Sequence, residues 1–216
     1  MNRRKFITKT LSLVVSSTCI NSMIPNVAKA ANKQDTKGNK MKILVITGSP
    51  RKNGNSNMLA SEFIRGAKEN GHTIQRFDAG KAEVSPCTAC NSCNMDGPCV
   101  LEDDFLKVRD HVINADMVVF ATPMYYFGFS SQLKAVIDRF YSINGKIHVH
   151  KKAALLMTYA DSAERKARPI NVHYEELLHY LGWEDVGRVI APGVWTEGSI
   201  KGTKYPNMAY ELGRKI

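Results

Sequence analysis

The feature that most constrains this chain is the stretch of residues 42–57, KILVITGSPRKNGNSN. Its apolar residues 43–46 stop at Thr-Gly-Ser-Pro, and two cations and several small polar residues follow before a helical pattern begins at Met58. This order predicts a buried strand, a short loop and the N-terminus of a helix. Such a junction gathers backbone N–H groups, hydroxyls and the positive end of a helix dipole at one point, so it is suited to an anion of phosphate size.

The rest of the chain alternates between strand-like and helix-like segments. Strands are predicted at 42–46, 73–78, 117–121, 153–158 and 186–190, and helices at 58–70, 105–113, 130–140, 169–181 and 208–215. This alternation requires parallel strands joined by helical crossovers. We therefore predict an α/β fold, a doubly wound five-stranded parallel sheet of order 2-1-3-4-5 with helices on both faces. In that order the loops 48–57 and 123–128 flank one crevice at the switch point.

Residues 1–30 resemble a twin-arginine export signal. Arg3 and Arg4 precede a modestly apolar run at 11–24, and Ala28-Lys29-Ala30 supplies a small-residue cleavage pattern. The run is too short and too polar to span a bilayer stably. We expect a signal peptide at 1–30, a polar linker at 31–40 and a mature domain at 41–216 that is exported, to the periplasm or another extracytoplasmic location.

The net charge of the chain and the distribution of its basic residues bear on whether it binds nucleic acid. The predicted signal contains five cations and no acids, so its removal lowers the formal charge from +10 to +5. The remaining basic residues are scattered, which argues against a nucleic-acid partner. The twin-arginine route carries folded proteins, so a signal of this type suggests a cofactor inserted before export.

The two loops at the predicted switch point carry the groups that a flavin mononucleotide (FMN) requires. Side chains that can hold the phosphate are Ser49, Arg51, Asn55, Ser56 and Asn57. Residues that can contact the isoalloxazine ring are Met124, Tyr125, Tyr126 and Phe127, and the family resemblance given below extends this set to Pro123 and Gly128. A Ser/Asn/Gly loop is usually only a turn, and an aromatic cluster is usually core. Two such loops at one switch point favour the flavin interpretation.

The segments GSPRKNGNSNMLA and ATPMYYFGFSSQLKAVIDRFY resemble the two flavin-binding signatures of the NADPH-dependent FMN reductase family. Within it, the chain is similar to the subgroup that includes iron–sulfur flavoproteins. The resemblance runs from Met41 to the C-terminus and implies a flavodoxin-like fold with non-covalent FMN held by the two loops. Thr158–Asp161 would approach the pyrimidine edge of the flavin.

The same resemblance implies an FMN-dependent oxidoreductase that passes electrons from NAD(P)H, or another small-molecule or protein donor, to an acceptor. No catalytic side chain is assigned, because the flavin itself carries out the redox step. The family resemblance also implies a homodimer or homotetramer. An exported protein has no NADPH pool, however, so the signal at 1–30 puts the family's usual donor in question.

A cysteine-rich insertion at 86–99 leaves three interpretations open. Cys87, Cys90, Cys93 and Cys99 form a compact C-x2-C-x2-C-x5-C pattern, and the first three have the spacing of ferredoxins. By resemblance they would hold a [4Fe–4S] cluster, which makes an electron carrier with a protein redox partner the alternative function. A structural zinc site and two disulfides are the other interpretations. Elsewhere, Asp138-Arg139 is interpreted as a surface or interface charge pair.

Overall fold

The structure is a computed structural model that describes residues 40–216. The predicted signal peptide and nearly all of the predicted linker therefore lie outside the described residues. The chain divides into two units, Met1–Lys37 and Gly38–Ile216, and the described residues all belong to the second.

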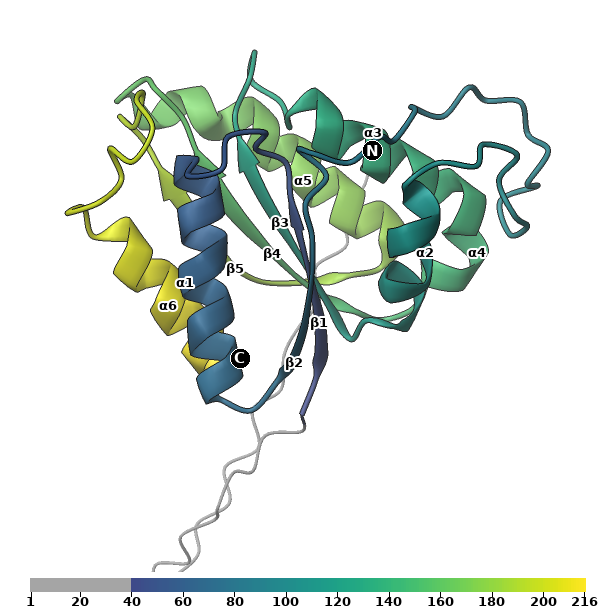
Figure 1. The fold of residues 1–216 in the computed structure, drawn as a ribbon, viewed down its shortest axis with the longest axis horizontal. Coiled ribbons are helices and arrows are strands. Elements are labelled where there is room, and N and C mark those ends of the chain that lie inside the picture. Colours follow the sequence, from purple (N-terminus) through teal and green to yellow (C-terminus); the bar gives the residue numbers. More distant parts are fainter. Residues whose placement is uncertain (1–39) are drawn as a thin grey trace, which may run out of the picture. The chain divides into compact units, whose positions relative to one another are not determined.

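The second unit contains one five-stranded sheet, with at least one helix between each pair of successive strands and with α6 after the last strand (Figure 1). The strands are β1 (Lys42–Thr47), β2 (Thr73–Phe77), β3 (Met117–Pro123), β4 (Lys152–Thr158) and β5 (Glu184–Ala191). The α-helices are α1 (Asn55–Glu69), α2 (Phe105–Asn114), α3 (Ser131–Asp138), α4 (Asn144–Ile147), α5 (Arg168–Leu181) and α6 (Tyr205–Lys215). Two 3₁₀ helices, η1 (Arg139–Ile143) and η2 (Glu164–Ala167), complete the set.

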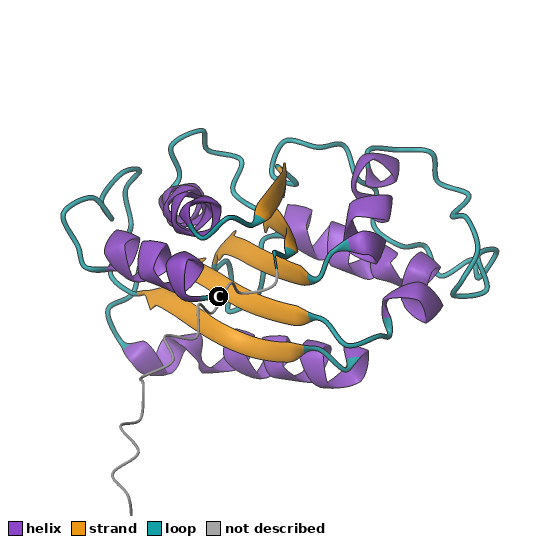
Figure 2. Cartoon of the chain, turned by 90° about the horizontal axis from the view of Figure 1, so that it is seen from below, coloured by secondary structure: helices purple, strands orange, loops and turns teal. Residues whose placement is uncertain are grey.

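All neighbouring strands pair in parallel, in the order β2-β1-β3-β4-β5, which confirms the predicted fold class and strand order. Residues of β1 and β3 are almost wholly buried, as expected for strands covered on both faces. Figure 2 shows the strands between two layers of helices. Among residues 40–216, none of the helices combines the length and apolar character needed to cross a bilayer.

The two faces of the sheet carry separate apolar cores. One face packs against α1 and α6, which lie side by side in Figure 1. Their close approach depends on glycine: a Cβ on Gly66 would lie 2.1 Å from the carbonyl oxygen of Tyr210, and one on Gly213 would lie 2.2 Å from that of Phe63. The other face packs against α2, α3 and α5, around Phe120 and Tyr174.

The element boundaries differ from the prediction mainly at the start of the first helix. Helix α1 begins at Asn55 rather than Met58, and its N-cap is Gly54. The polar residues 55–57 therefore form the first helical turn, and their backbone N–H groups have no partner four residues earlier. This shift matters because it places three polar residues at the positive end of the helix.

Candidate functional site

The loop between β1 and α1 is compact and leaves polar groups without partners. Ser49 and Ser56 are buried, with 4% and 1% of their surface exposed. No side chain caps the helix at Gly54, and the buried Ser56 Oγ has no hydrogen-bond partner. Free N–H groups at a helix N-terminus together with a free buried hydroxyl form a site that suits an anion.

Residues just after β2 hold this loop in place. Thr47 Oγ1 donates to Asp78 Oδ1 at 2.6 Å, and Gly80 N–H donates to the Thr47 carbonyl at 3.0 Å. Asn57, predicted as a phosphate ligand, donates through Nδ2 to the Arg51 carbonyl at 2.7 Å and so supports the loop from behind. Arg51 itself is exposed at the rim.

Asp78 accepts the hydrogen bond from Thr47 at the end of β1. Burial raises the pKa of its carboxyl, but hydrogen bonds from Thr47 and Arg76 outweigh that effect and hold the pKa below its usual range. The ionised carboxylate is therefore the form that supports the end of β1.

The loop after β3 is joined to the first loop by Ser130. Its Oγ donates to the Gly48 carbonyl at 2.8 Å and accepts from Leu133 N–H as the N-cap of α3. A Cβ on Gly48 would lie 2.3 Å from the same Oγ, so the two loops touch closely. The predicted convergence of the ends of β1 and β3 thus rests on a specific contact.

The aromatic part of the second loop is a tight turn. Tyr125 and Gly128 exchange both backbone hydrogen bonds, and Tyr126 and Phe127 between them have φ values of +45° and +66°. Residues other than glycine rarely adopt this left-handed backbone conformation, because it costs roughly 1 kcal/mol or more per residue. Tyr126 is fully exposed and Phe127 is 46% exposed. The turn therefore presents two aromatic rings outside the core at a cost in stability.

A cavity of about 210 Å³ lies between the two loops. Its lining comes from four segments that follow strand ends: Ser49, Arg51, Gly54, Asn55 and Ser56; Pro123, Met124 and Tyr125; Thr158, Tyr159 and Ala160; and Val194 and Trp195. Of the predicted ring contacts, Tyr126 and Phe127 line an adjoining depression instead. Val194 and Trp195 were missed by sequence reasoning, because nothing in their local sequence marks them as part of a site.

The cysteine-rich insertion encloses a second and much smaller cavity, of about 10 Å³. Figure 1 shows the insertion projecting beyond α2 and α4. All four cysteines are free and line this cavity together with Arg139 and Tyr141. Among residues 40–216, however, no three His, Cys, Asp or Glu side chains are grouped closely enough to hold a metal ion.

The backbone of this insertion has an unusual conformation. Four of its non-glycine residues have positive φ: Ala89, Asn91, Asn94 and Met95. Left-handed residues between right-handed ones turn successive N–H groups toward one point, a geometry common around phosphates and iron–sulfur clusters. Cys90 is exposed, and hydrogen bonds from Ser92 lower the pKa of its thiol, which favours the thiolate that metals bind.

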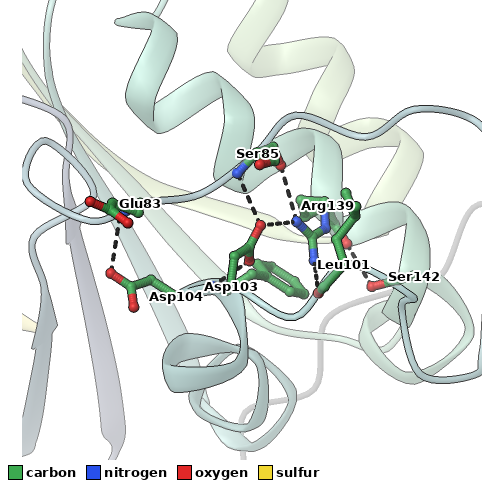
Figure 3. Close-up of polar contacts among 8 residues, drawn as sticks. Glu83, Ser85, Leu101, Asp103, Asp104, Arg139 and Ser142 are labelled. Atoms are coloured by element: carbon green, nitrogen blue, oxygen red, sulfur yellow. Dashed lines mark hydrogen bonds and ion pairs between the residues drawn. The ribbon is translucent and has the colours of Figure 1, made fainter.

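Arg139 holds both ends of the insertion (Figure 3). Its Nη1 donates to the Ser85 carbonyl at 3.0 Å and to Asp103 Oδ2 at 2.6 Å, and its Nη2 donates to the Leu101 carbonyl at 2.9 Å. The side chain is 0% exposed and Asp103 is 15% exposed. The prediction of a surface charge pair at Asp138-Arg139 was therefore wrong. The sequence around Arg139 gives no sign of this burial, because the segment that covers it, at Asp103, lies 36 residues earlier in the chain.

Asp103 is the ionised partner of this guanidinium. Burial raises the pKa of its carboxyl, but hydrogen bonds from Phe105 N–H, Arg139 and Ser85 N–H together hold the pKa below its usual range. Helix α3 thus connects two loops: Ser130 at its start contacts the Gly48–Asn57 loop, and Arg139 at its end holds the cysteine-rich insertion.

Comparison with known proteins places the two loops in a family context. Residues 41–194 match the sequence model of the family described as NADPH-dependent FMN reductase. An iron–sulfur flavoprotein of Archaeoglobus fulgidus is 28% identical over 177 residues, which cover 82% of this chain and 79% of the relative. An iron–sulfur flavoprotein of Methanocaldococcus jannaschii is 34% identical over 99 residues, 46% of this chain. The chain spans about half the length of that relative, 51%.

Solved structures extend the likeness at the level of the fold. An NAD(P)H:quinone oxidoreductase from Methanothermobacter marburgensis superposes with a TM-score of 0.66 at 20% identity. The match covers 82% of this chain and 96% of that one. At this identity the likeness concerns the flavodoxin-like fold alone.

Proposed function

Because the chain belongs to the NADPH-dependent FMN reductase family, we propose that it binds FMN non-covalently in the cavity between its two switch-point loops and acts as a flavin-dependent oxidoreductase. The observation that carries the proposal is the buried Ser56 Oγ, which lacks a partner at the uncapped start of α1. A buried hydroxyl without a partner costs about 1–3 kcal/mol, and a phosphate oxygen would offset that cost.

In this proposal each element of the cavity has a defined task. The N–H groups of α1 and the hydroxyls of Ser49 and Ser56 bind the phosphate, and Arg51 adds charge from the rim. Residues 123–125 and 158–160 contact the ring, and Ser130 fixes the distance between the two loops. The flavin, when bound, supplies the electron-transfer chemistry, so no side chain is needed as a general acid or base.

The phosphate contacts can be tested with Arg51→Ala combined with Ser56→Ala. Loss of one charge-assisted and one neutral hydrogen bond should weaken FMN binding by about 2–4 kcal/mol. The affinity is read from quenching of flavin fluorescence during titration of flavin-free protein. Lys52→Ala is the matched control, because Lys52 is an exposed neighbouring cation outside the cavity lining. Unchanged FMN affinity in the double variant would refute the site.

The electron donor is tested separately, by anaerobic mixing of the FMN-loaded protein with NADPH or NADH. We propose NAD(P)H as donor, and rapid loss of the flavin's visible absorption supports this proposal. Arg51 lines the cavity and Lys166 lines the adjoining depression, so two cations are available to the phosphates of such a donor. If the absorption persists with both nucleotides while the flavin bleaches with dithionite, the donor is another molecule.

A second candidate function, an electron carrier with a [4Fe–4S] cluster, is favoured by the cysteine-rich insertion. Cys87, Cys90, Cys93 and Cys99 are all free, line one cavity and sit on a backbone with repeated left-handed residues. Their donor chemistry fits a cluster, although the thiols would have to move closer together to bind it. Two relatives with matching regions are named iron–sulfur flavoproteins.

The absorption spectrum and iron content of anaerobically purified protein test this second candidate. About four irons per chain with broad visible absorption beyond that of flavin supports the cluster. Substoichiometric iron with four titratable thiols would leave the flavin as the redox group. Zinc bound by four thiolates would appear in the same metal analysis.

Export and oligomerisation complete the proposal. We propose that residues 1–30 direct the protein through the twin-arginine route, on the strength of Arg3-Arg4 and the Ala28-Lys29-Ala30 pattern. Replacing both arginines by lysine should retain the precursor in the cytoplasm, as followed by fractionation. A homodimer or homotetramer is proposed from the family alone, and sedimentation measures it.

A further inference from the structure

The segment from Val194 to Ile200 is held against the start of α1 mainly by the side chain of Asn55, and Glu197 Oε1 in this segment also accepts from Asn53 N–H at 3.1 Å. Asn55 Nδ2 lies 2.9 Å from the Thr196 carbonyl, 3.3 Å from Ser199 Oγ and 3.5 Å from the Val194 carbonyl. Asn55 Oδ1 accepts from Ile200 N–H at 3.3 Å. Both ends of the carboxamide are therefore engaged with a segment that lies about 140 residues away in sequence.

These contacts change what Asn55 can do for a phosphate. Its Nδ2 donors are directed at the 194–200 segment, and the residue is only 8% exposed. Its backbone N–H, at the first position of α1, stays available to an anion. The side chain of Asn55 therefore holds the 194–200 segment, and its backbone N–H contributes to the anion site.

The segment carries Trp195 to the mouth of the cavity. Two backbone bonds fix the preceding residues to the end of β4: Gly193 N–H to the Asp161 carbonyl at 3.0 Å and Val194 N–H to the Tyr159 carbonyl at 2.9 Å. Trp195 lines both the main cavity and the adjoining depression with Tyr126 and Phe127. Its side chain is nevertheless 76% exposed, although it is one of the largest apolar groups in the chain.

Trp195 also lies outside the part of the chain that matches the family. That match ends at Val194, so the position and role of Trp195 do not follow from family membership. An exposed indole held on a tethered segment beside a ligand cavity is poised to cover a flat ligand, since aromatic rings gain from stacking as well as from burial.

We propose that Trp195 packs against the isoalloxazine ring of bound FMN and that Asn55 is a positioning residue that holds Trp195 there. The inference rests on the proposed FMN site. It adds a ring contact from the loop after β5, and it joins that contact to the helix end that binds the phosphate. Loss of the Asn55 side chain should then weaken the binding of the isoalloxazine ring, whereas loss of the Ser56 hydroxyl should weaken the binding of the phosphate.

Tryptophan fluorescence of the full chain tests the ring contact directly. The chain has two tryptophans, and Trp183 is buried with its indole N–H bonded to the Ile147 carbonyl. The difference in emission between wild type and Trp195→Phe therefore reports Trp195. We expect this difference to be largely quenched during FMN titration, with the midpoint given by the flavin's own fluorescence. Since Trp195 is exposed, the variant should fold normally and bind FMN about 2–10-fold more weakly.

A second titration separates the role of Asn55 from a phosphate contact. Asn55→Ala should weaken the binding of riboflavin, which lacks the phosphate, as much as that of FMN. The matched variant Ser56→Ala should weaken FMN alone. If Asn55→Ala weakens only FMN, its positioning role is overturned. If FMN binds but the Trp195 emission stays constant, the ring contact is overturned while the FMN site stands. Failure of wild type to quench flavin fluorescence would instead overturn the proposed function.

Discussion

The Gly48–Asn57 loop and the cysteine-rich insertion are both attached to α3, but they are built differently. The first is short, buried at Ser49 and Ser56, and held along its length by Asn57 from within and by Ser130 from α3. The second spans residues 86–99, is largely exposed, and is held mainly at its two ends by Arg139. Of the six non-glycine residues with positive φ among residues 40–216, four lie in this insertion.

This contrast shows two ways of preparing a binding site. The first loop is set by the strand end and the helix start, so the fold itself provides an anion site. The insertion has no helix or strand of its own. Arg139 fixes the points where it leaves and rejoins the domain, and two further bonds hold its interior: Tyr141 Oη donates to Asn91 Oδ1 at 2.8 Å, and Gly145 N–H donates to the Met95 carbonyl at 3.0 Å. Its interior conformation is strained, which is common where a loop is shaped around a ligand.

The largest test of this contrast is Arg139→Met. The change leaves Asp103 without its counter-ion and the carbonyls of Ser85 and Leu101 without a donor. Breaking a buried pair in this way costs about 3–5 kcal/mol, to be measured by urea unfolding. The matched control is Arg65→Met, which removes exposed ion pairs with Glu62 and Glu69 and an exposed contact with the Tyr210 ring, and should cost only about 1 kcal/mol. Equal effects of the two variants would mean that Arg139 does not anchor the insertion.

Ser130→Ala tests the contact between the two switch-point loops. It removes the N-cap of α3 and leaves the Gly48 carbonyl without the Ser130 hydroxyl, so the free energy of unfolding should fall by about 2 kcal/mol. FMN affinity should fall as well. Ser131→Ala, one residue later and exposed, should change stability by less than about 0.5 kcal/mol. A cost no greater than that of the control would contradict the role of Ser130.

The pH dependence of stability tests Asp103. Its pKa is lowered in the folded state, so its carboxylate contributes stability above the unfolded pKa of roughly 3.9 that is lost as pH falls through the folded pKa. We expect Asp103→Asn to be less stable than wild type near neutral pH and to lose less stability between about pH 5 and pH 2. Urea unfolding across this range measures both. A parallel loss in the two proteins would show that Asp103 is not a source of acid sensitivity.

The smallest expected effect comes from the strain in the insertion. Ala89 is exposed with φ of +55°, so Ala89→Gly should stabilise the protein by a few tenths to about 1 kcal/mol. Ala163 has φ of −75°, and Ala163→Gly should be destabilising by a similar amount. Thermal unfolding compares them. Destabilisation in both would mean that the insertion stores no backbone strain.

Sequence reasoning reached the fold because the signals for it are local. Buried apolar runs such as Met117–Ala121 and the alternation of strand and helix define a parallel sheet, and the strand order follows from topology. The convergence of the ends of β1 and β3 was predictable for the same reason. The first helix begins three residues before the predicted start at Met58, because Gly54, rather than a polar residue, takes the N-cap position.

The parts that were missed depend on contacts between distant segments. Trp195 joins the cavity because Asn55 and the end of β4 hold its loop, and no local pattern encodes that placement. Arg139 reads as a surface charge beside Asp138, yet it is buried by the returning stem of the insertion. Long polar side chains can be either solvated or buried, and only the tertiary fold decides between them.

The connection of both loops to α3 has a geometric consequence. Ser130 and Arg139 are nine residues apart, so the helical rise separates them by about 14 Å along the axis. The helix therefore sets the distance between the points at which the two loops are anchored. An inserted residue would lengthen it by ~1.5 Å and rotate one end by roughly 100° relative to the other. The separation of these two anchor points is therefore a property of helix length and not of any single side chain.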